Sequence, residues 1–259
     1  MPIEHYHAHH GMKPKFFKLR EESGVPYLGV ELEVDKSPDR NSEEVADKLT
    51  EIMGANFMYY ETDGSVEHGF ECITQPATFG YHYTRKHNNY ENAFRLLVSS
   101  NFRSHNTNSC GLHVHVNRNY FKNDKSYLFL LKVFDKYWNE LSVFSRRQPS
   151  QLSRWASRYE GTPEQILNTH EDIFDRYKCI NFGNYNTIEF RIFRGTLNPT
   201  SYFSCLKLVD NICTMANQFA DDRIRMEDIK FEDFLTEEYM KDYWQHAQTL
   251  HSRHNTQGE

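Results

Sequence analysis

The sequence predicts an α+β fold with a mainly antiparallel sheet. Stretches that alternate apolar and polar residues predict strands, and longer stretches with apolar residues at helical spacing lie between them. Short turn signals join several strands directly, and such hairpins pair antiparallel strands. We expect residues 26–259 to form a single domain with a helical C-terminal third. The preceding residues 1–25 are expected to be a polar arm, with histidines at His5, His7, His9 and His10.

The first half of the chain alternates strands with two helices. Val45 and Leu49 fall on one side of the first helix, and Phe94 and Leu97 on one side of the second. The turn signal Asp63-Gly-Ser65 predicts a hairpin tip. The expected elements are a strand at 27–35, a helix at 43–53, strands at 56–61 and 69–75, a helix at 89–100 and a strand at 110–117.

The second half is richer in helix. One long apolar stripe, from Leu128 to Phe144, predicts a single helix, and Pro199 opens another. Gly183-Asn184 is a turn signal between two strands. The expected elements are a helix at 124–146, a short helix from Thr162, strands at 177–183 and 186–194, and a helix at 200–220.

Composition excludes several classes of protein. The net charge of −6 provides no basic field for nucleic acid. No apolar run approaches the roughly 18 residues of a membrane span, and the N-terminus lacks the apolar core of a signal peptide. The five cysteines are odd in number and include no CxxC, which is typical of reduced thiols. We therefore expect a cytoplasmic protein that binds neither nucleic acid nor membrane.

A repeated pattern of acidic residues and histidines marks the predicted strands. Residues i and i+2 of a strand share a face, so each pair at this spacing points one way, while the residues between the pairs are apolar and suit a core. Two further carboxylates, eight positions apart, lie at the predicted hairpin. The pairs are Glu31 and Glu33, Asp63 and Glu71, His113 and His115, and Glu189 and Arg191.

Charge favours a common metal site for these residues. Two like charges about 4 Å apart repel by about 4 kcal/mol at an effective dielectric near 20. Five carboxylates converging on one pocket would need cations to cancel them, so the pattern predicts a site for more than one divalent ion. For any one pair alone, a strand with one face in water is the ordinary explanation.

In order and spacing, these motifs resemble those of the amidoligase family, within the superfamily of carboxylate–amine ligases that includes glutamine synthetase and glutamate–cysteine ligase. The resemblance covers about residues 27–200. It is carried by Gly29-x-Glu31-x-Glu33, Asp63-Gly-Ser…Gly69-x-Glu71-x-x-Thr74-x-Pro76, Cys110-Gly-Leu-His-Val-His-Val and Thr187-Ile-Glu-Phe-Arg-x-x-x-Gly195-Thr-Leu-Asn. The middle cluster begins with Asp, as in amidoligases and unlike glutamine synthetase. The chain is also much shorter than a glutamine synthetase subunit.

The resemblance implies a curved antiparallel sheet or partial barrel that binds ATP and magnesium. It assigns one ion to Glu33, Asp63 and Glu71, and the other to Glu31, His113 and Glu189. It places Arg191 at the acyl-phosphate region. Our candidate catalytic residues are therefore Arg191, His115 and Arg194, where His115 would orient phosphate or carboxylate, and Arg194 falls at a strand end or in a buried pair. Manganese would tolerate the histidine ligand better than magnesium.

The implied activity is an ATP-dependent ligation of a carboxylate to an amine through an acyl phosphate. Family members from phages and mobile elements suggest a peptide, protein or wall component as substrate. A basic segment suits phosphate binding, with a solvated helix end as its alternative. The candidate cofactor-binding residues are Arg146, Arg147, Arg154, Asn108 and Ser109.

Two other functions stay open from the sequence. A divalent-metal-dependent hydrolase is the enzymatic alternative, because His-x-His also occurs in metallohydrolases. The non-enzymatic alternative is a catalytically silent scaffold that binds a nucleotide or peptide. ATP-dependent release of phosphate would separate the ligase from both.

Overall fold

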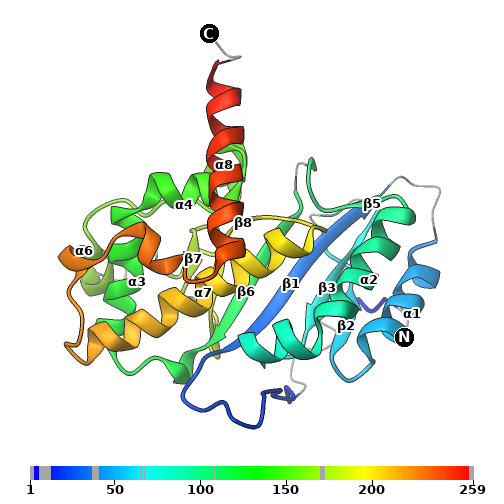
Figure 1. The fold of residues 1–259 in the computed structure, drawn as a ribbon, viewed down its shortest axis with the longest axis horizontal. Coiled ribbons are helices and arrows are strands. Elements are labelled where there is room, and N and C mark those ends of the chain that lie inside the picture. Colours follow the sequence, from blue (N-terminus) through cyan, green and yellow to red (C-terminus); the bar gives the residue numbers. More distant parts are fainter. Residues whose placement is uncertain are drawn as a thin grey trace. The chain divides into compact units, whose positions relative to one another are not determined.

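A computed structural model describes residues 3–5, 13–36, 41–64, 66, 68–107, 109–169 and 173–256. It confirms the α+β class with antiparallel pairing of the strands (Figure 1). The chain divides into two compact units, which are described separately. Unit 1 comprises Met1–Val116 and Arg194–Phe203, and unit 2 comprises Asn117–Phe193 and Ser204–Glu259.

Unit 1 is built on an antiparallel sheet with the strand order β2-β3-β1-β6, and two short strands also pair with β1. Its helices are α1 and α2, and a π-helical turn covers Tyr81–Arg85. The bounds are β1 Tyr27–Lys36, α1 Ser42–Met53, β2 Met58–Glu61, β3 Phe70–Thr74, β4 Ala77–Thr78, α2 His87–Ser99, β5 Phe102–Arg103 and β6 Gly111–Asn117.

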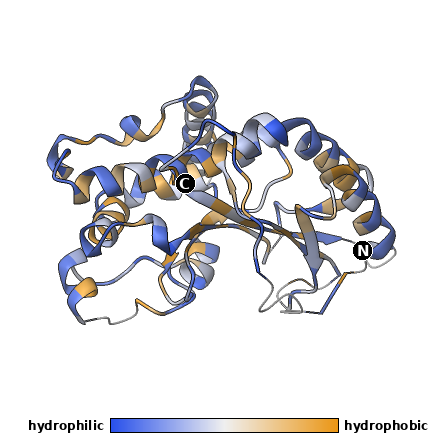
Figure 2. Cartoon of the chain, turned by 90° about the horizontal axis from the view of Figure 1, so that it is seen from below, coloured by the Kyte–Doolittle hydropathy of each residue, from blue (hydrophilic) through white to orange (hydrophobic). Residues whose placement is uncertain are grey.

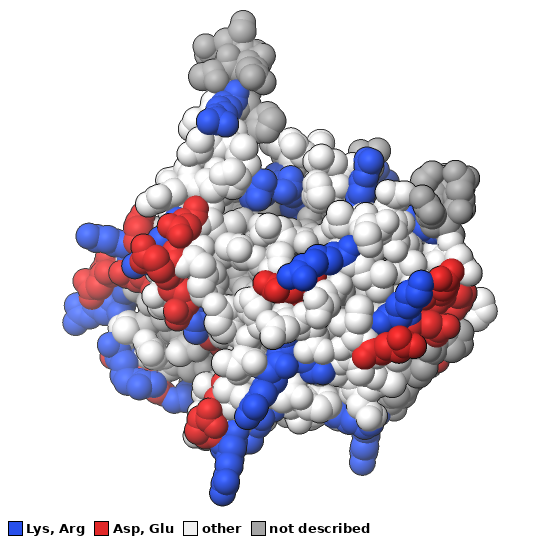
Figure 3. All heavy atoms as spheres, turned by 45° about the vertical axis from the view of Figure 1, so that its right-hand side comes forward, with Lys and Arg blue, Asp and Glu red and all other residues white. Residues whose placement is uncertain are grey.

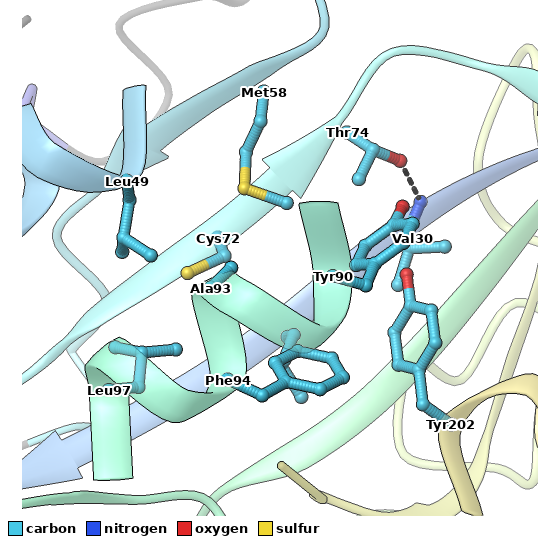
Figure 4. Close-up of a pocket in the computed structure, with 11 residues that line it drawn as sticks. Val30, Leu49, Met58, Cys72, Thr74, Tyr90, Ala93, Phe94, Leu97 and Tyr202 are labelled. Atoms are coloured by element: carbon cyan, nitrogen blue, oxygen red, sulfur yellow. Dashed lines mark hydrogen bonds between the residues drawn. The ribbon is translucent and has the colours of Figure 1, made fainter. Parts of the chain in front are cut away.

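Helices α1 and α2 cover the apolar face of this sheet. Leu49 of α1 and Tyr90, Phe94 and Leu97 of α2 lie against Val30 and the residues beside it, around a cavity of about 10 Å³ (Figure 4). Both helices carry hydrophobic and hydrophilic residues, as expected for helices with one buried side (Figure 2). The opposite face of the sheet is therefore left for the polar residues.

Local signals explain where α1 begins and ends. The side chain of Asn41 accepts a hydrogen bond from the amide of Glu44, and Glu43 and Glu44 add negative charge to the first turn. Gly54 follows the helix at φ 88°, a conformation that glycine adopts without strain. Lys48 pairs with Glu44 at 2.7 Å on the outer side. Acidic and basic side chains are interspersed on the face drawn in Figure 3.

Part of the N-terminal arm packs on the rest of unit 1. Glu4 pairs with Glu61 at the edge of β2, and Phe17 pairs with Ala77 of β4. The amide of Leu19 and the hydroxyl of Thr78 both donate to the Glu22 carboxylate. His7, His9 and His10 lie outside the described residues.

Unit 2, as far as the structure describes it, is mainly helical and contains the hairpin β7–β8, which agrees with the turn signal at Gly183-Asn184. The helices and strands that lie wholly or mainly in unit 2 are α3 Asp124–Lys136, α4 Trp138–Ser145, α5 Pro149–Trp155, α6 Pro163–Thr169, β7 Ile180–Asn181, β8 Thr187–Arg194 and α8 Glu238–Thr256. Helix α7, Pro199–Ala220, begins in unit 1. Short 3-10 turns span Arg118–Tyr120, Met226–Asp228 and Phe231–Phe234. Among the described residues, no helix is long and apolar enough to cross a membrane.

Two predicted elements differ from the structure. The single helix expected at 124–146 is two helices, because Tyr137 leaves helical geometry at φ −111° and ψ 28° while its buried hydroxyl donates to the carbonyl of Ile229. The strand expected at 177–183 is confined to Ile180–Asn181. Before it, the Asp175 carboxylate accepts from the amide of Tyr177 at 2.9 Å, which makes a turn. All five cysteines are buried thiols outside any disulfide, in agreement with the expectation of reduced thiols.

Candidate functional site

The polar face of the unit 1 sheet brings together residues from four strands. One row of directly opposed residues crosses three of these strands. In it, Glu61 faces Glu71, and Glu71 faces Glu33. The next row on the same face pairs Glu31 with His113, and Gly29 faces His115. Between these positions Val30, Leu32, Leu112 and Val114 are at most 3% exposed on the other face. The alternation predicted from the sequence therefore holds within this unit.

Glu31 lies between the two histidines. One carboxylate oxygen is 3.5 Å from Nδ1 of His113, and the other is 3.1 Å from Nε2 of His115. Burial by itself would raise the pKa of Glu31, but the charge of His115 and hydrogen bonds from both imidazoles lower that pKa well below its usual range. Glu31 is thus held as a carboxylate with two imidazoles against it.

Glu33 is fixed by the backbone of β6. The amide of Gly111 donates to one carboxylate oxygen of Glu33 at 2.5 Å. The hydroxyl of Ser104 donates to the Glu33 carbonyl at 2.7 Å. Gly195 sits so close to Ser104 that a Cβ there would clash with the Ser104 backbone, which explains a glycine in the last motif.

Glu71 converges with Glu33 and His113. Each offers a ligand atom, and these atoms lie within 4.8 Å of one another. Burial, together with the charges of four neighbouring carboxylates, raises the pKa of Glu71 well above its ordinary value. A Cβ at Gly69 would overlap the backbone of Val34, so this glycine lets β3 enter beside β1.

Asp63 lies beyond the end of β2, on the loop that leads to β3. It is partly exposed, and its charge is among those that raise the pKa of Glu71. This places Asp63 near the carboxylate face, and its role as a metal ligand stays a prediction. Ser65 lies outside the described residues.

Two residues of this face were missed by sequence reasoning. Glu61 is 4% exposed and faces Glu71 across the sheet. Burial, and then the charges of Glu61, Glu31 and Glu71, raise the pKa of the Tyr59 hydroxyl, which places Tyr59 beside the same carboxylates. The available signal was the spacing of Tyr59, Glu61 and Asp63, each two residues from the next.

The donors of unit 1 fit a divalent metal ion. Magnesium binds oxygen ligands at about 2.0–2.1 Å, so ligands on opposite sides of it lie about 4.2 Å apart. The atoms of Glu33, Glu71 and His113 are within that range after small side-chain shifts. Burial and the charges of four neighbouring carboxylates raise the pKa of Glu71, and a cation would offset those charges.

The Glu189 and Arg191 pair of the last motif lies on the hairpin of unit 2. Arg191 donates to the Glu189 carboxylate, and both side chains are at least nine-tenths buried. The other oxygen of Glu189 accepts from the side chains of Asn181 at 2.8 Å and Asn184 at 3.1 Å. Arg147 donates to the Arg191 carbonyl at 2.6 Å. That Glu189 and Arg191 share a cavity with the unit 1 residues stays a prediction.

The basic segment is dispersed. Arg147 is buried, whereas Arg146 adopts a left-handed conformation at the end of α4 (φ 56°), with its guanidinium 6.0 Å from the ring centre of Tyr243. Arg154 is exposed, and its guanidinium lies 4.4 Å from the ring centre of Trp155. Arg194 is the last residue of β8, which agrees with the expectation that it falls at a strand end.

The structure describes one of the two candidate residues that precede the His motif. Ser109 is partly buried just before β6, and Asn108 lies outside the described residues.

Comparison with known proteins gives a distant structural likeness. No family model matches the sequence, and no curated protein matches it. The chain is similar to a solved structure described as the crystal structure of the complex between prokaryotic ubiquitin-like protein Pup and its ligase PafA. The identity is 10% and the TM-score is 0.41. The match covers 76% of this chain and 48% of that chain, so the chain spans about half the length of the protein that it matches.

Proposed function

We propose that this chain is an ATP- and magnesium-dependent ligase that joins a carboxylate to an amine through an acyl phosphate. The observation that carries the proposal is the polar face of the unit 1 sheet. There, buried carboxylates from three strands lie beside two histidines, and burial together with the charges of its acidic neighbours raises the pKa of Glu71. A face of this kind suits divalent cations and, with them, a polyphosphate.

Each group has a role in this proposal. Glu31, Glu33, Asp63, Glu71, His113 and, from unit 2, Glu189 hold the metal ions. Bound magnesium supplies neutralisation of phosphate charge. His115, held by Glu31, orients a phosphate or carboxylate oxygen. Arg191 donates to charge that develops during phosphoryl transfer, and Arg194 remains a further catalytic candidate.

The reaction balances as two transfers. A substrate carboxylate oxygen bonds to the γ-phosphorus of ATP, and the bond to ADP breaks. The amine nitrogen then bonds to the acyl carbon, phosphate leaves, and the amine loses a proton. The nucleotide-binding candidates are Arg146, Arg147, Arg154, Ser109 and Asn108. Because Arg147 is buried against the Arg191 carbonyl, it supports β8 in this scheme as well.

The test is phosphate release from ATP in the presence of magnesium, hydroxylamine and candidate carboxylates, including peptides and proteins. Hydroxylamine converts an acyl phosphate into a hydroxamate, so hydroxamate and ADP should form together and both should stop in excess EDTA. Formation of AMP would contradict the acyl-phosphate route. Equal binding of an ATP analogue with and without EDTA would contradict the role of the metal.

Arg191 offers a sharper test of the same mechanism. Arg191→Ala should lower turnover on the order of 100-fold, as loss of one transition-state donor does, while ATP binding weakens less. Arg191→Lys keeps the charge and separates this effect from misfolding of the buried pair. Arg223→Ala is the matched control, because Arg223 is exposed and pairs with Asp221 elsewhere in unit 2.

A metal-dependent hydrolase is the second candidate. The observation that favours it is the contact of both imidazoles with Glu31, a mixed donor set that also suits zinc or manganese. Amide cleavage without consumption of nucleotide would establish this function in place of the ligase. A silent scaffold would bind nucleotide and show neither reaction.

A further inference from the structure

The outer edge of strand β2 carries an extended segment of the chain itself. β2 lies at one end of the strand order of the sheet, and residues 3–5 run along it. The amide of Glu4 donates to the carbonyl of Tyr60 at 3.0 Å, and the amide of Thr62 donates to the carbonyl of Glu4 at 2.8 Å. These hydrogen bonds form a parallel bridge between Glu4 and Glu61, so the segment lies on β2 as an added strand.

This segment is held through its main chain. In addition to the bridge, the amide of Ile3 donates to the side-chain carboxylate of Glu43 in α1 at 2.9 Å. In these three hydrogen bonds, residues 3–5 contribute only backbone amides and one backbone carbonyl. Every extended peptide carries the same groups, whatever its side chains. The β2 edge and the Glu43 carboxylate therefore suit a main chain rather than one particular sequence.

The segment is short enough to be displaced. Ile3 and Glu4 are half-buried, and His5 is exposed. A hydrogen bond within a protein contributes little net free energy, because it replaces a hydrogen bond to water. When the segment leaves, the carbonyl of Tyr60 and the amide of Thr62 lie open at the strand edge. Such an edge is a template on which another extended chain can add as a strand.

The same edge leads to the polar face of the unit 1 sheet. Thr62 directly precedes Asp63, a candidate metal ligand. Residues paired on neighbouring strands point to the same face, so the residue that takes the place of Glu4 shares the face of Glu61. A peptide that adds to β2 would present one of its side chains to the polar face.

We propose that the outer edge of β2 is a docking edge for an extended peptide segment of another molecule, which adds as a strand in place of residues 3–5. In the free protein, residues 3–5 close the edge until such a peptide displaces them. The docking needs neither metal nor nucleotide, and so goes beyond the proposed function. Delivery of a substrate group to the polar face is the part that rests on that function.

Hydrogen exchange of the full chain, followed by NMR in EDTA without nucleotide, tests the resident strand. Glu4→Pro removes the amide that donates to Tyr60 and keeps an extended backbone. The Thr62 amide should then exchange on the order of 10-fold faster, as expected when the two hydrogen bonds of the bridge are lost together. Glu4→Ala keeps the amide and should behave like the unmodified chain. His5→Pro is the matched proline control, because the amide of the next strand residue points away from β2.

A peptide added in trans tests the docking edge. A synthetic peptide with the sequence of residues 1–8 is titrated into Glu4→Pro up to millimolar concentration, the range that a short tether provides in cis. It should shift the Thr62 amide signal and slow its exchange, and a peptide with alanine in place of Glu4 should do the same. A peptide N-methylated at that position lacks the amide hydrogen and should do neither. The unmodified chain should need about 10-fold more peptide, because its own segment competes.

Each of three results would overturn the proposal. Unchanged exchange of Thr62 in Glu4→Pro would show that residues 3–5 do not close the edge. Absence of peptide binding to Glu4→Pro, or equal binding of the N-methylated peptide, would exclude recognition through the main chain. Slower exchange of Thr62 at higher protein concentration, without peptide, would assign the edge to a second copy of the chain. Because these measurements use neither ATP nor metal, failure of the ligase reaction leaves their outcome unaffected.

Discussion

The two faces of the unit 1 sheet are made from alternate residues of the same strands, yet they differ in chemistry. On the covered face, Leu28, Val30, Leu32 and Val34 are at most 3% exposed, and Val30 and Leu32 line the cavity beneath α1 and α2. On the other face, Gly29, Glu31 and Glu33 alternate with them. Gly29 and Glu31 face histidines, and Glu33 faces the carboxylate of Glu71. The backbone pairing is common to both, so the difference lies wholly in the side chains.

This comparison teaches which face stabilises the fold. Burial of apolar side chains is favourable by roughly 25 cal/mol per Å², whereas opposed carboxylates repel. The covered face therefore stabilises unit 1, whereas the opposed carboxylates of the acidic face destabilise it. Under the proposed function, a bound cation would offset that repulsion. Changes on the two faces should have opposite effects on the metal-free protein.

The largest change in stability is expected from a substitution on the covered face. Leu32 pairs with Cys72 and Leu112 and lines the cavity beneath α2. Leu32→Ala should lower the free energy of unfolding by about 2–5 kcal/mol, because it removes apolar contact and enlarges a space that is already incompletely filled. Urea denaturation measures this. A loss below about 1 kcal/mol, the range of ordinary surface changes, would contradict the assignment of this face as the core.

The next effect concerns a polar group on the covered side. His82 is fully buried, and its Nε2 donates to the Leu28 carbonyl at 3.0 Å while Nδ1 accepts from the Tyr90 hydroxyl at 2.8 Å. The carbonyl can only accept, which fixes this tautomer. Burial lowers the pKa of His82 to about 4.

The sign of the pH dependence follows from that pKa. In the unfolded chain the imidazole titrates near its ordinary value, so the unfolded state binds the proton first as the pH falls. The contribution of neutral His82 to the free energy of unfolding is complete above about pH 6.5. It falls by about 3 kcal/mol as the pH drops to 4, because each unit of difference between the two pKa values corresponds to about 1.4 kcal/mol. Unfolding measured from pH 7 to 4 should decline less steeply in His82→Gln, which cannot titrate. Parallel curves would contradict the prediction.

How far the sequence could predict these faces depends on the range of each contact. Alternation is local, so the orientations of Glu31, Glu33, His113 and His115 within unit 1 followed from spacing alone. Register is not local. The hydrogen bond from Gly111 to Glu33 joins residues 78 apart, and no spacing rule reports it. Glu61 was missed for the same reason, since its importance comes from facing Glu71.

The errors in secondary structure also have local physical causes. The apolar stripe at 124–146 continues through the bend at Tyr137, so periodicity alone gave no sign of two helices. The strand before β7 was shortened by the Asp175 turn, a side-chain hydrogen bond that competes with strand pairing. Both cases show a single side chain overriding a pattern that its neighbours share.

The smallest expected change in stability is an increase, and it tests the contrast between the two faces most directly. Glu71→Gln removes a buried charge from the acidic row and keeps its volume. In excess EDTA this variant should be more stable than the unmodified chain by up to about 1 kcal/mol, the range of cross-strand pair energies. Chemical denaturation of both proteins in EDTA measures the difference, with Glu51→Gln, on the exposed side of α1, as the control that should show none.

Two changes of condition should erase or reverse that gain. With saturating magnesium, the unmodified chain gains stability by mass action and the variant gains less, so their order should invert. As the pH falls through the raised pKa of Glu71, the unmodified carboxylate takes up a proton and its repulsion disappears, so the advantage of Glu71→Gln should narrow. If Glu71→Gln is instead destabilised in EDTA at neutral pH, the acidic face contributes to stability as it stands, and the contrast between the two faces is wrong.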